Sequence, residues 1–222
     1  MDKKNKIGVL LPTFVRPDFV RSVVIQLLAQ SVPPELICVH QNGTEISYDW
    51  CVKDLNRQQV RWLHSPEKLP QSEWYSRPLS FLIEEECTHF FWVDHDDMYF
   101  SNHIQEGMDT LNQGFDFSVN FYAGLLKMKP PRYFYKANYP FTAHGPGGMS
   151  SSMCFNRAFA HGLLEDLLKF PEVFYADNIL TLHTMPRFRC HVSQSQPTTV
   201  YVCHENTVSS SSWLADADNW SF

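Results

Sequence analysis

The stretch Phe90-Phe91-Trp92-Val93-Asp94-His95-Asp96-Asp97 decides the fold that this sequence predicts. Its four apolar residues run without polar relief, which is typical of a strand covered on both faces in a parallel sheet. Three carboxylates follow at once, and clustered like charges are costly unless they are solvated, capped or neutralised. Because open α/β sheets bind ligands beyond the carboxyl ends of their strands, the pattern predicts a divalent cation held partly by these carboxylates and partly by substrate phosphates.

A strand, a helix and a second strand precede this stretch. Ile7 to Leu11 reads as a strand closed by Pro12-Thr13, and Pro17 suits the first position of a helix that reaches about Gln30. The second strand, Leu36 to Val39, ends at Gln41-Asn42-Gly43-Thr44. Short connections of this kind predict a right-handed βαβ unit with parallel strands.

Strand and helix patterns continue through the rest of the chain. The expected elements are a strand at 60–63, a helix from Ser72 or Arg77, a helix capped by Ser101 and ended by Gly114, one or two strands in 115–135, a helix capped by Asn156, and a last strand at 199–203. This order predicts an α/β fold.

Length and charge limit the classes of protein to consider. With 222 residues the chain can form one sizeable α/β domain, and its 44% hydrophobic content indicates a globular protein. A net charge of −6 argues against a nucleic-acid partner, because phosphate neutralisation needs clustered Lys and Arg. A nucleotide ligand is still allowed if a metal neutralises its phosphates.

The cysteines and the N-terminus suggest a compartment. The six cysteines contain no C-x-x-C pair, so we expect buried free thiols in a reducing environment in preference to disulfides or zinc. Met1 to Lys6 is polar, and only a short apolar run follows, so neither a signal peptide nor a transmembrane segment is expected. These observations predict a cytoplasmic protein, which could work at a membrane surface as a peripheral protein through its substrate.

The acidic stretch also carries a resemblance to a known family. An apolar strand that ends in Asp94-His95-Asp96-Asp97 resembles the metal and sugar-nucleotide motif, Asp-x-Asp, of GT-A-fold glycosyltransferases, especially the inverting enzymes of family 2. Four other segments agree with that family in chain order. The resemblance implies a single GT-A domain with a Rossmann-like, mostly parallel central sheet flanked by helices.

The resemblance places nucleotide contacts after the first two strands. In the family, Pro-Thr or Pro-Ser and a later polar cluster hold the base and ribose, which implies roles for Pro12, Thr13, Arg16, Gln41 and Asn42. Family members commonly have Asp where this chain has Gln41 or Asn42. An amide donates as well as accepts hydrogen bonds, so the identity of the base stays open. The alternative is that Asn42 and the glycine after it simply form a turn.

Two further contacts come from the same resemblance. Arg77 corresponds to an arginine near the diphosphate, although a solvated arginine is the alternative. The glycine-rich turn at 145–148 and the strand after it correspond to the segment that lines the sugar pocket, which makes Gly148 a candidate contact. The alternative for this segment is a turn with a polar edge strand.

Catalysis is assigned by the resemblance to Asp177. Inverting enzymes have a carboxylate at this point of the chain as general base, often with an acidic neighbour that is Ala176 here. The alternative is that Asp177 is a helix N-cap. His204 matches a third protein ligand of the metal beside Asp94 and Asp96, with Asp94 also a candidate for the ribose, and whether Asp97 is a ligand stays open. Imidazole favours Mn²⁺ over Mg²⁺.

The sequence thus predicts a metal-dependent inverting glycosyltransferase that uses a UDP-, GDP- or dTDP-sugar and a hydroxyl of a glycan, glycolipid or glycoprotein acceptor. About 1–97 would form the nucleotide-binding half, about 98–206 the acceptor and sugar half, and 207–222 a flap or tail. One alternative is a nucleotidyltransferase acting on sugar phosphates, although the residues after the first strand lack the glycine-rich loop usual there. The other is a non-catalytic carbohydrate-binding relic.

Overall fold

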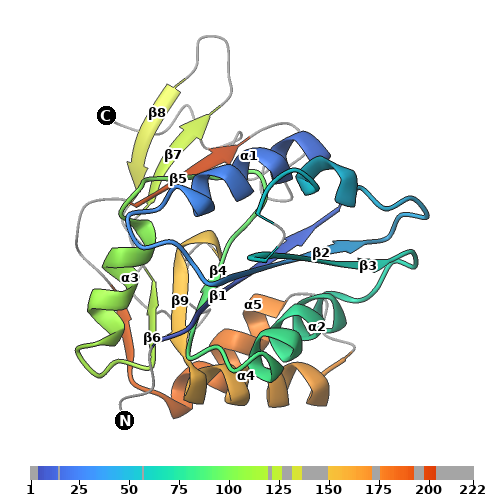
Figure 1. Cartoon of the computed structure of the whole chain (residues 1–222). Coiled ribbons are helices and arrows are strands. Elements are labelled where there is room, and N and C mark those ends of the chain that lie inside the picture. The colour runs from blue at the N-terminus through green and yellow to red at the C-terminus, as the bar shows by residue number, and fades with distance from the viewer. Residues whose placement is uncertain are drawn as a thin grey trace.

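A seven-stranded, mostly parallel sheet forms the centre of the structure, a computed structural model (Figure 1). Its strands, in spatial order, are β10 (Cys190–Val192), β6 (Phe117–Val119), β9 (Met153–Asn156), β4 (His89–Trp92), β1 (Ile7–Thr13), β2 (Leu36–Asn42) and β3 (Val60–Ser65). Only β9 among these pairs antiparallel to its neighbours, β4 and β6. The structure describes residues 5–14, 16–56, 58–119, 122–126, 132–136, 150–171, 176–192 and 198–203.

Helices cover both faces of this sheet. They are α1 (Pro17–Leu28), α2 (Gln71–Glu84), α3 (His103–Leu111), α4 (Arg157–Lys169) and α5 (Ala176–Ile179), with the short turns η1 (Asp49–Val52), η2 (Ser150–Ser152), η3 (Leu180–Thr184) and η4 (Met185–Arg187). In Figure 1, α1 lies above the sheet and α2, α4 and α5 lie below it. The α/β fold expected from the sequence is confirmed.

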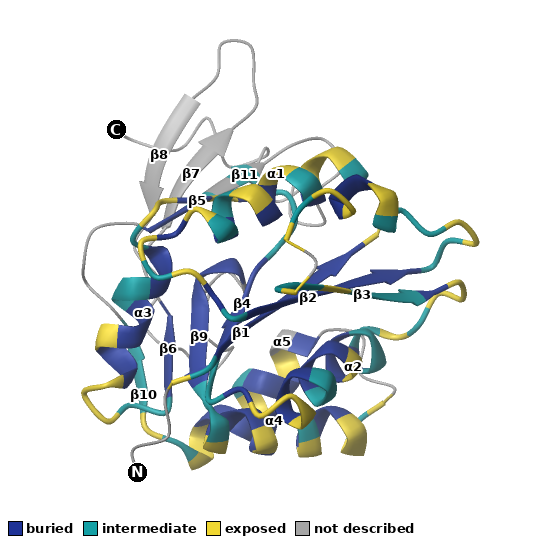
Figure 2. Cartoon of the chain, viewed as in Figure 1, coloured by how far each residue is buried: buried dark blue, intermediate teal, exposed yellow. Residues whose placement is uncertain are grey.

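Strand β1 shows how the sequence builds two apolar layers. Leu10 belongs to the core shared with α2, α4 and α5, whereas Ile7, Val9 and Leu11 belong to the core shared with α1 and α3. This alternation follows from the two-residue period of a strand, and both faces are buried because helices cover both. Figure 2 shows the central strands in the colour of buried residues.

The order of the central strands creates a switch in the direction of the chain. After β1 the chain moves outward through β2 and β3, and it then returns to form β4 on the other side of β1. Such a switch point leaves a crevice beyond the carboxyl ends of the two strands, and ligands bind there in open α/β sheets. The acidic stretch follows β4, and Thr13 ends β1.

A second sheet adjoins this edge. It consists of β5 (Met98–Tyr99), β11 (Thr199–Cys203), β7 (Tyr122–Leu126) and β8 (Arg132–Lys136). The expectation of one or two strands in 115–135 was too low, since β6, β7 and β8 all begin there. The strands β5 and β10 were not predicted because two or three residues show no readable alternation. Strand β5 comes directly after the acidic stretch and pairs with β11.

Several smaller expectations can also be compared with the structure. Asn156 caps α4 by accepting a hydrogen bond from the backbone N–H of Phe159, whereas α3 begins after Asn102 and not at Ser101. The five cysteines whose side chains the structure describes, Cys38, Cys51, Cys87, Cys154 and Cys190, are free thiols. Among the described residues, no helix has the length and apolar character needed to cross a membrane.

Candidate active site

The acidic stretch forms a turn that connects the two sheets. Asp94 and Asp96 are half-buried, and Asp97 is 3% exposed. The hydroxyl of Tyr99 accepts a hydrogen bond from the backbone N–H of Asp94 at 2.9 Å and donates one to its carbonyl at 3.1 Å. Burial raises the pKa of Tyr99 well above its usual value, so the hydroxyl stays protonated and keeps this double contact. Tyr99, in β5, therefore stabilises the start of the turn through both backbone groups of Asp94.

Arg16 joins the two sides of the switch point. It precedes α1 just beyond β1, and its Nη1 lies 2.7 Å from Oδ2 of Asp96. Both side chains are largely shielded, with 22% and 15% of their areas exposed. The family resemblance implied a nucleotide contact for Arg16 and a metal contact for Asp96, and the structure brings the two side chains into direct contact.

Asp97 lies deeper than its neighbours. Its Oδ1 accepts a hydrogen bond from the backbone N–H of Val202 in β11 at 3.0 Å. Burial, and next the charges of Asp94 and Asp96, raise the pKa of Asp97 well above its ordinary value, while the nearby Ser151 hydroxyl and the Val202 N–H act in the opposite direction. Oδ2 makes no hydrogen bond of normal geometry with a described residue. Asp97 therefore fixes β11 to the acidic turn.

The end of β1 offers two more groups. Thr13 is 1% exposed, and its hydroxyl has no hydrogen-bond partner among the described residues. Phe14, which follows it, is 43% exposed, and its ring lies against Gly43, where a Cβ would come within 2.8 Å of it. Our sequence analysis did not include Phe14, although an aromatic residue directly after the Pro12-Thr13 strand end was a readable signal. Exposed aromatic rings of this kind can stack on a base.

Gln41 and Asn42 are the last residues of β2 and are buried. The amide of Gln41 donates to the Ile46 carbonyl and accepts from the Tyr48 N–H at 2.8 Å. The amide of Asn42 accepts from the Leu69 N–H at 2.9 Å and donates to the Leu69 carbonyl at 3.3 Å. Both side chains thus hold the loops at this edge, and a nucleotide contact for either stays a prediction. Gly43 has φ +77°, as the turn alternative requires.

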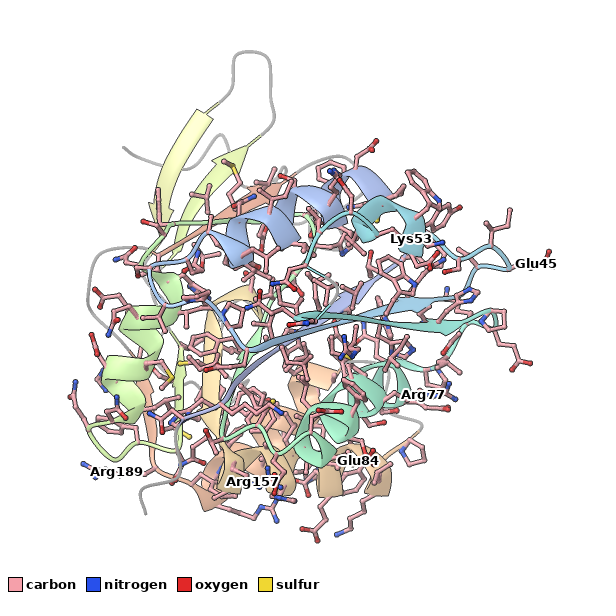
Figure 3. The ribbon with its side chains drawn as sticks, viewed as in Figure 1. Glu45, Lys53, Arg77, Glu84, Arg157 and Arg189 are labelled. Atoms are coloured by element: carbon pink, nitrogen blue, oxygen red, sulfur yellow. The ribbon has the colours of Figure 1, made fainter. Side chains whose placement is uncertain are left out.

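Arg77 is anchored at the surface of α2, as Figure 3 shows. Its Nη1 donates to the Ser65 hydroxyl at 3.0 Å, and its Nη2 pairs with Glu73 one turn earlier. The Ser65 hydroxyl also contacts Nε2 of the buried His40, whose Nδ1 faces the Trp74 carbonyl. Since that carbonyl can only accept, Nδ1 carries the proton and Nε2 accepts from Ser65. Arg77 is 47% exposed and hydrogen-bonded, and its contact with phosphate stays a prediction.

The remaining candidates are described in part or not at all. Asp177 is the second residue of α5, so it lies inside the helix and not at an N-cap, and the structure describes its backbone only. Gly148 and His204 lie outside the described residues. His204 follows β11, which Asp97 ties to the acidic turn, by one position in the sequence.

The donor set fits a hard divalent cation in part. Within the described ranges, no three His, Cys, Asp or Glu side chains gather as a metal cluster. Mg²⁺ and similar ions are often held by one or two carboxylates together with substrate phosphates. Asp94 and Asp96 can supply those carboxylates, and the shielded oxygen of Asp97 lies beside them. The residues present are therefore compatible with a metal that arrives with its diphosphate.

Comparisons with known proteins place the fold. No family model matches the sequence, and a search of curated proteins finds no match. Among solved structures, a fragment of S. aureus TarS in complex with UDP-GlcNAc superposes with a TM-score of 0.65 at 14% identity, over 91% of this chain and 60% of that one. The chain has a GT-A fold. The same TarS fragment in complex with UDP gives a TM-score of 0.65 at 13% identity, over 89% and 60%.

Another solved structure has a similar fold. 4-Diphosphocytidyl-2C-methyl-D-erythritol synthase superposes with a TM-score of 0.57 at 13% identity, over 97% of this chain and 99% of that one. At these identities the likeness concerns the fold alone. This GT-A chain spans about 60% of the length of the TarS fragments it matches.

Proposed function

We propose that this protein transfers a sugar from a nucleoside diphosphate sugar to an acceptor hydroxyl with inversion at the anomeric carbon. The observation that carries the proposal is the Arg16–Asp96 contact across the switch point, where the end of β1 meets the acidic turn after β4. A cation and two carboxylates at this crevice suit a ligand that brings both a diphosphate and a divalent metal. The UDP-GlcNAc bound by the TarS fragment supports a ligand of this class.

Each group has a defined task in this proposal. Asp94 and Asp96, with His204, would hold Mn²⁺ or Mg²⁺, which when bound would neutralise charge on the departing diphosphate. Thr13 and Phe14 would contact the nucleoside, and Arg16 would pair with phosphate oxygens. Gln41 and Asn42, which end β2, would contact the base and ribose, and Arg77, which bonds to Ser65 at the end of β3, would contact the diphosphate. Asp177 would accept the proton of the acceptor hydroxyl as that oxygen attacks the anomeric carbon.

A nucleotidyltransferase is the second candidate, because the erythritol synthase matches this chain over nearly its whole length. Such an enzyme would join a nucleoside triphosphate to a sugar or alditol phosphate and release pyrophosphate. The residues that follow β1, Phe14 to Arg16, contain no glycine-rich loop that could surround a triphosphate. This difference favours the glycosyltransferase.

One product assay separates the candidates. Purified protein is incubated with Mn²⁺ and either a panel of UDP-, GDP- and dTDP-sugars or the nucleoside triphosphates with sugar phosphates, and the released nucleotide and pyrophosphate are measured. We expect slow release of a nucleoside diphosphate from one donor, with water as acceptor. Pyrophosphate from a triphosphate would support the nucleotidyltransferase. Absence of both products would favour the carbohydrate-binding relic.

A further inference from the structure

The start of α2 makes two hydrogen bonds to backbone groups close to Asp177 in the sequence. Ser72 Oγ donates a hydrogen bond to the Pro171 carbonyl at 2.7 Å, and Gln71 Oε1 accepts one from the Ala176 N–H at 3.0 Å. Two successive residues of one helix thus bond to the backbone of Pro171 and of Ala176. Ser72 and Ala176 are fully buried, so water does not compete easily for these bonds.

The bond from Gln71 satisfies a group that α5 cannot satisfy by itself. Ala176 is the first residue of α5, and the first N–H groups of a helix have no partner within the helix. Here the acceptor is a side chain 105 positions away. Helix α5 has four residues and continues directly into the π-helical turn η3, so it depends on tertiary contacts for its position.

The residues just before α2 contact the end of β2, where we propose that the nucleotide binds. Asn42, at the end of β2, makes both of its amide hydrogen bonds to the backbone of Leu69. Leu69 is two residues before Gln71, with Pro70 at the N-cap of α2 between them. A short path of hydrogen bonds and rigid backbone therefore links Asn42 to the residue before Asp177.

We propose that Gln71 is a positioning residue, which sets the backbone of Asp177 relative to the nucleotide-binding edge. This inference rests on the proposed function, in which Asp177 is the general base. A misplacement of a catalytic group by about 1 Å can cost on the order of 100-fold in rate. Loss of the Gln71 acceptor would misplace Asp177, so it would lower turnover and leave donor affinity unchanged. In this proposal Gln71 acts through the backbone N–H of Ala176 and not through a contact of its own with the donor or the acceptor.

Two substitutions at Gln71 separate positioning from bulk packing. Gln71→Met keeps the size of the side chain but removes the acceptor, so kcat for donor hydrolysis should fall about 10- to 100-fold while KM stays within about twofold. Gln71→Glu keeps an acceptor oxygen and adds a negative charge near Asp177. This charge should raise the apparent pKa of the base, so the acidic limb of the kcat–pH profile should move upward and activity should recover at higher pH.

Amide hydrogen exchange supplies a readout that does not need turnover. The Ala176 N–H should exchange faster in Gln71→Met than in the wild type, and Gln71→Glu should restore its protection. Gln113→Met is the matched control and should change neither readout, because the hydrogen bonds of Gln113 to described residues are local: its side chain donates to the Asp109 carbonyl and its backbone N–H to the Thr110 carbonyl.

The outcomes distinguish this inference from the proposed function. Hydrolysis of the donor by the wild type but not by Asp177→Asn would support the proposed function. If Gln71→Met then keeps full kcat, the positioning role is overturned while the proposed function stands. If the wild type hydrolyses no donor, the proposed function fails, and the positioning role fails too because it depends on that function. If Gln71→Met loses kcat and Gln71→Glu shows no recovery of activity at any pH, the positioning role of Gln71 is also overturned.

Discussion

Arg16 and Asp96 form an ion pair of 2.7 Å between Nη1 and Oδ2, and they follow two neighbouring parallel strands, β1 and β4. The contact places the Arg16 guanidinium on the carboxylate of Asp96, which we propose as a metal ligand. In the proposed function, Arg16 would compete with the metal for Asp96 before the donor binds, and it would pair with phosphate once the metal binds that carboxylate.

Arg16→Ala should change two affinities in opposite directions. Loss of the competing guanidinium should strengthen binding of Mn²⁺ alone by about three- to tenfold, since a partly shielded ion pair contributes about 1 kcal/mol. Binding of a nucleoside diphosphate with Mn²⁺ should weaken, because a phosphate partner is lost. Titration calorimetry of both ligands checks this.

Arg21→Ala is the matched control for that experiment. Arg21 also forms an ion pair of 2.6 Å, with Asp54, but neither residue belongs to the acidic turn. It should leave both affinities unchanged. If Arg16→Ala also leaves the affinities for Mn²⁺ and for the nucleotide with Mn²⁺ unchanged, the metal does not replace Arg16 as the partner of Asp96.

Asp177→Asn should abolish transfer and retain the donor. An amide cannot accept the proton of the acceptor hydroxyl, so kcat should fall by at least about 100-fold while donor affinity stays within about threefold. Rapid quench kinetics and a binding titration on the same preparation measure the two quantities. A variant with normal turnover would remove Asp177 from the mechanism.

The stability of the protein should decrease in mild acid because of His40. Burial lowers the pKa of His40 to about 4, from an ordinary value near 6.5. Between these values the unfolded chain binds a proton that the folded chain does not. The free energy of unfolding should therefore fall as the pH drops from about 6.5 to about 4, with this residue contributing a slope of about 1.4 kcal/mol per pH unit.

Urea unfolding of the wild type and of His40→Gln between pH 4.5 and 7.5 tests this origin. The variant should be less stable at pH 7.5, because the bonds to Ser65 and Trp74 are altered, but its free energy should depend less on pH. His103 is also buried with its pKa lowered to about 3, so some acid sensitivity should persist. Equal pH slopes for the two proteins would show that His40 is not the source.

The sequence predicted the middle of the central sheet well because β1, β2 and β4 contain apolar runs with clear ends, whereas the three-residue strand β10 at its edge was missed. The runs at Ile7–Leu11 and Phe90–Val93 became β1 and β4, and the polar residues after them meet at one edge as parallel strands require. The second sheet was harder to predict, because β5 is only two residues long and pairs with a strand about 100 positions later.

The functions of individual side chains were less readable than the fold. Gln41 and Asn42 could be selected as polar residues at a strand end, but their bonds to the loops depend on residues up to 27 positions away. Gln71 carried no sequence signal, because its partner Ala176 is a backbone group and any residue can supply an N–H. Periodicity reports which face of an element is buried, and it does not report which distant group a side chain contacts.

The central claim is that the acidic turn binds a nucleoside diphosphate through a divalent cation. The most direct test is titration calorimetry of UDP, GDP and dTDP, with and without Mn²⁺, into the wild type, into Asp96→Ala and into the surface control Asp109→Ala. We expect one nucleotide to bind the wild type and the control only with Mn²⁺, and Asp96→Ala to bind none. Equal binding by Asp96→Ala, or binding that ignores Mn²⁺, would contradict it.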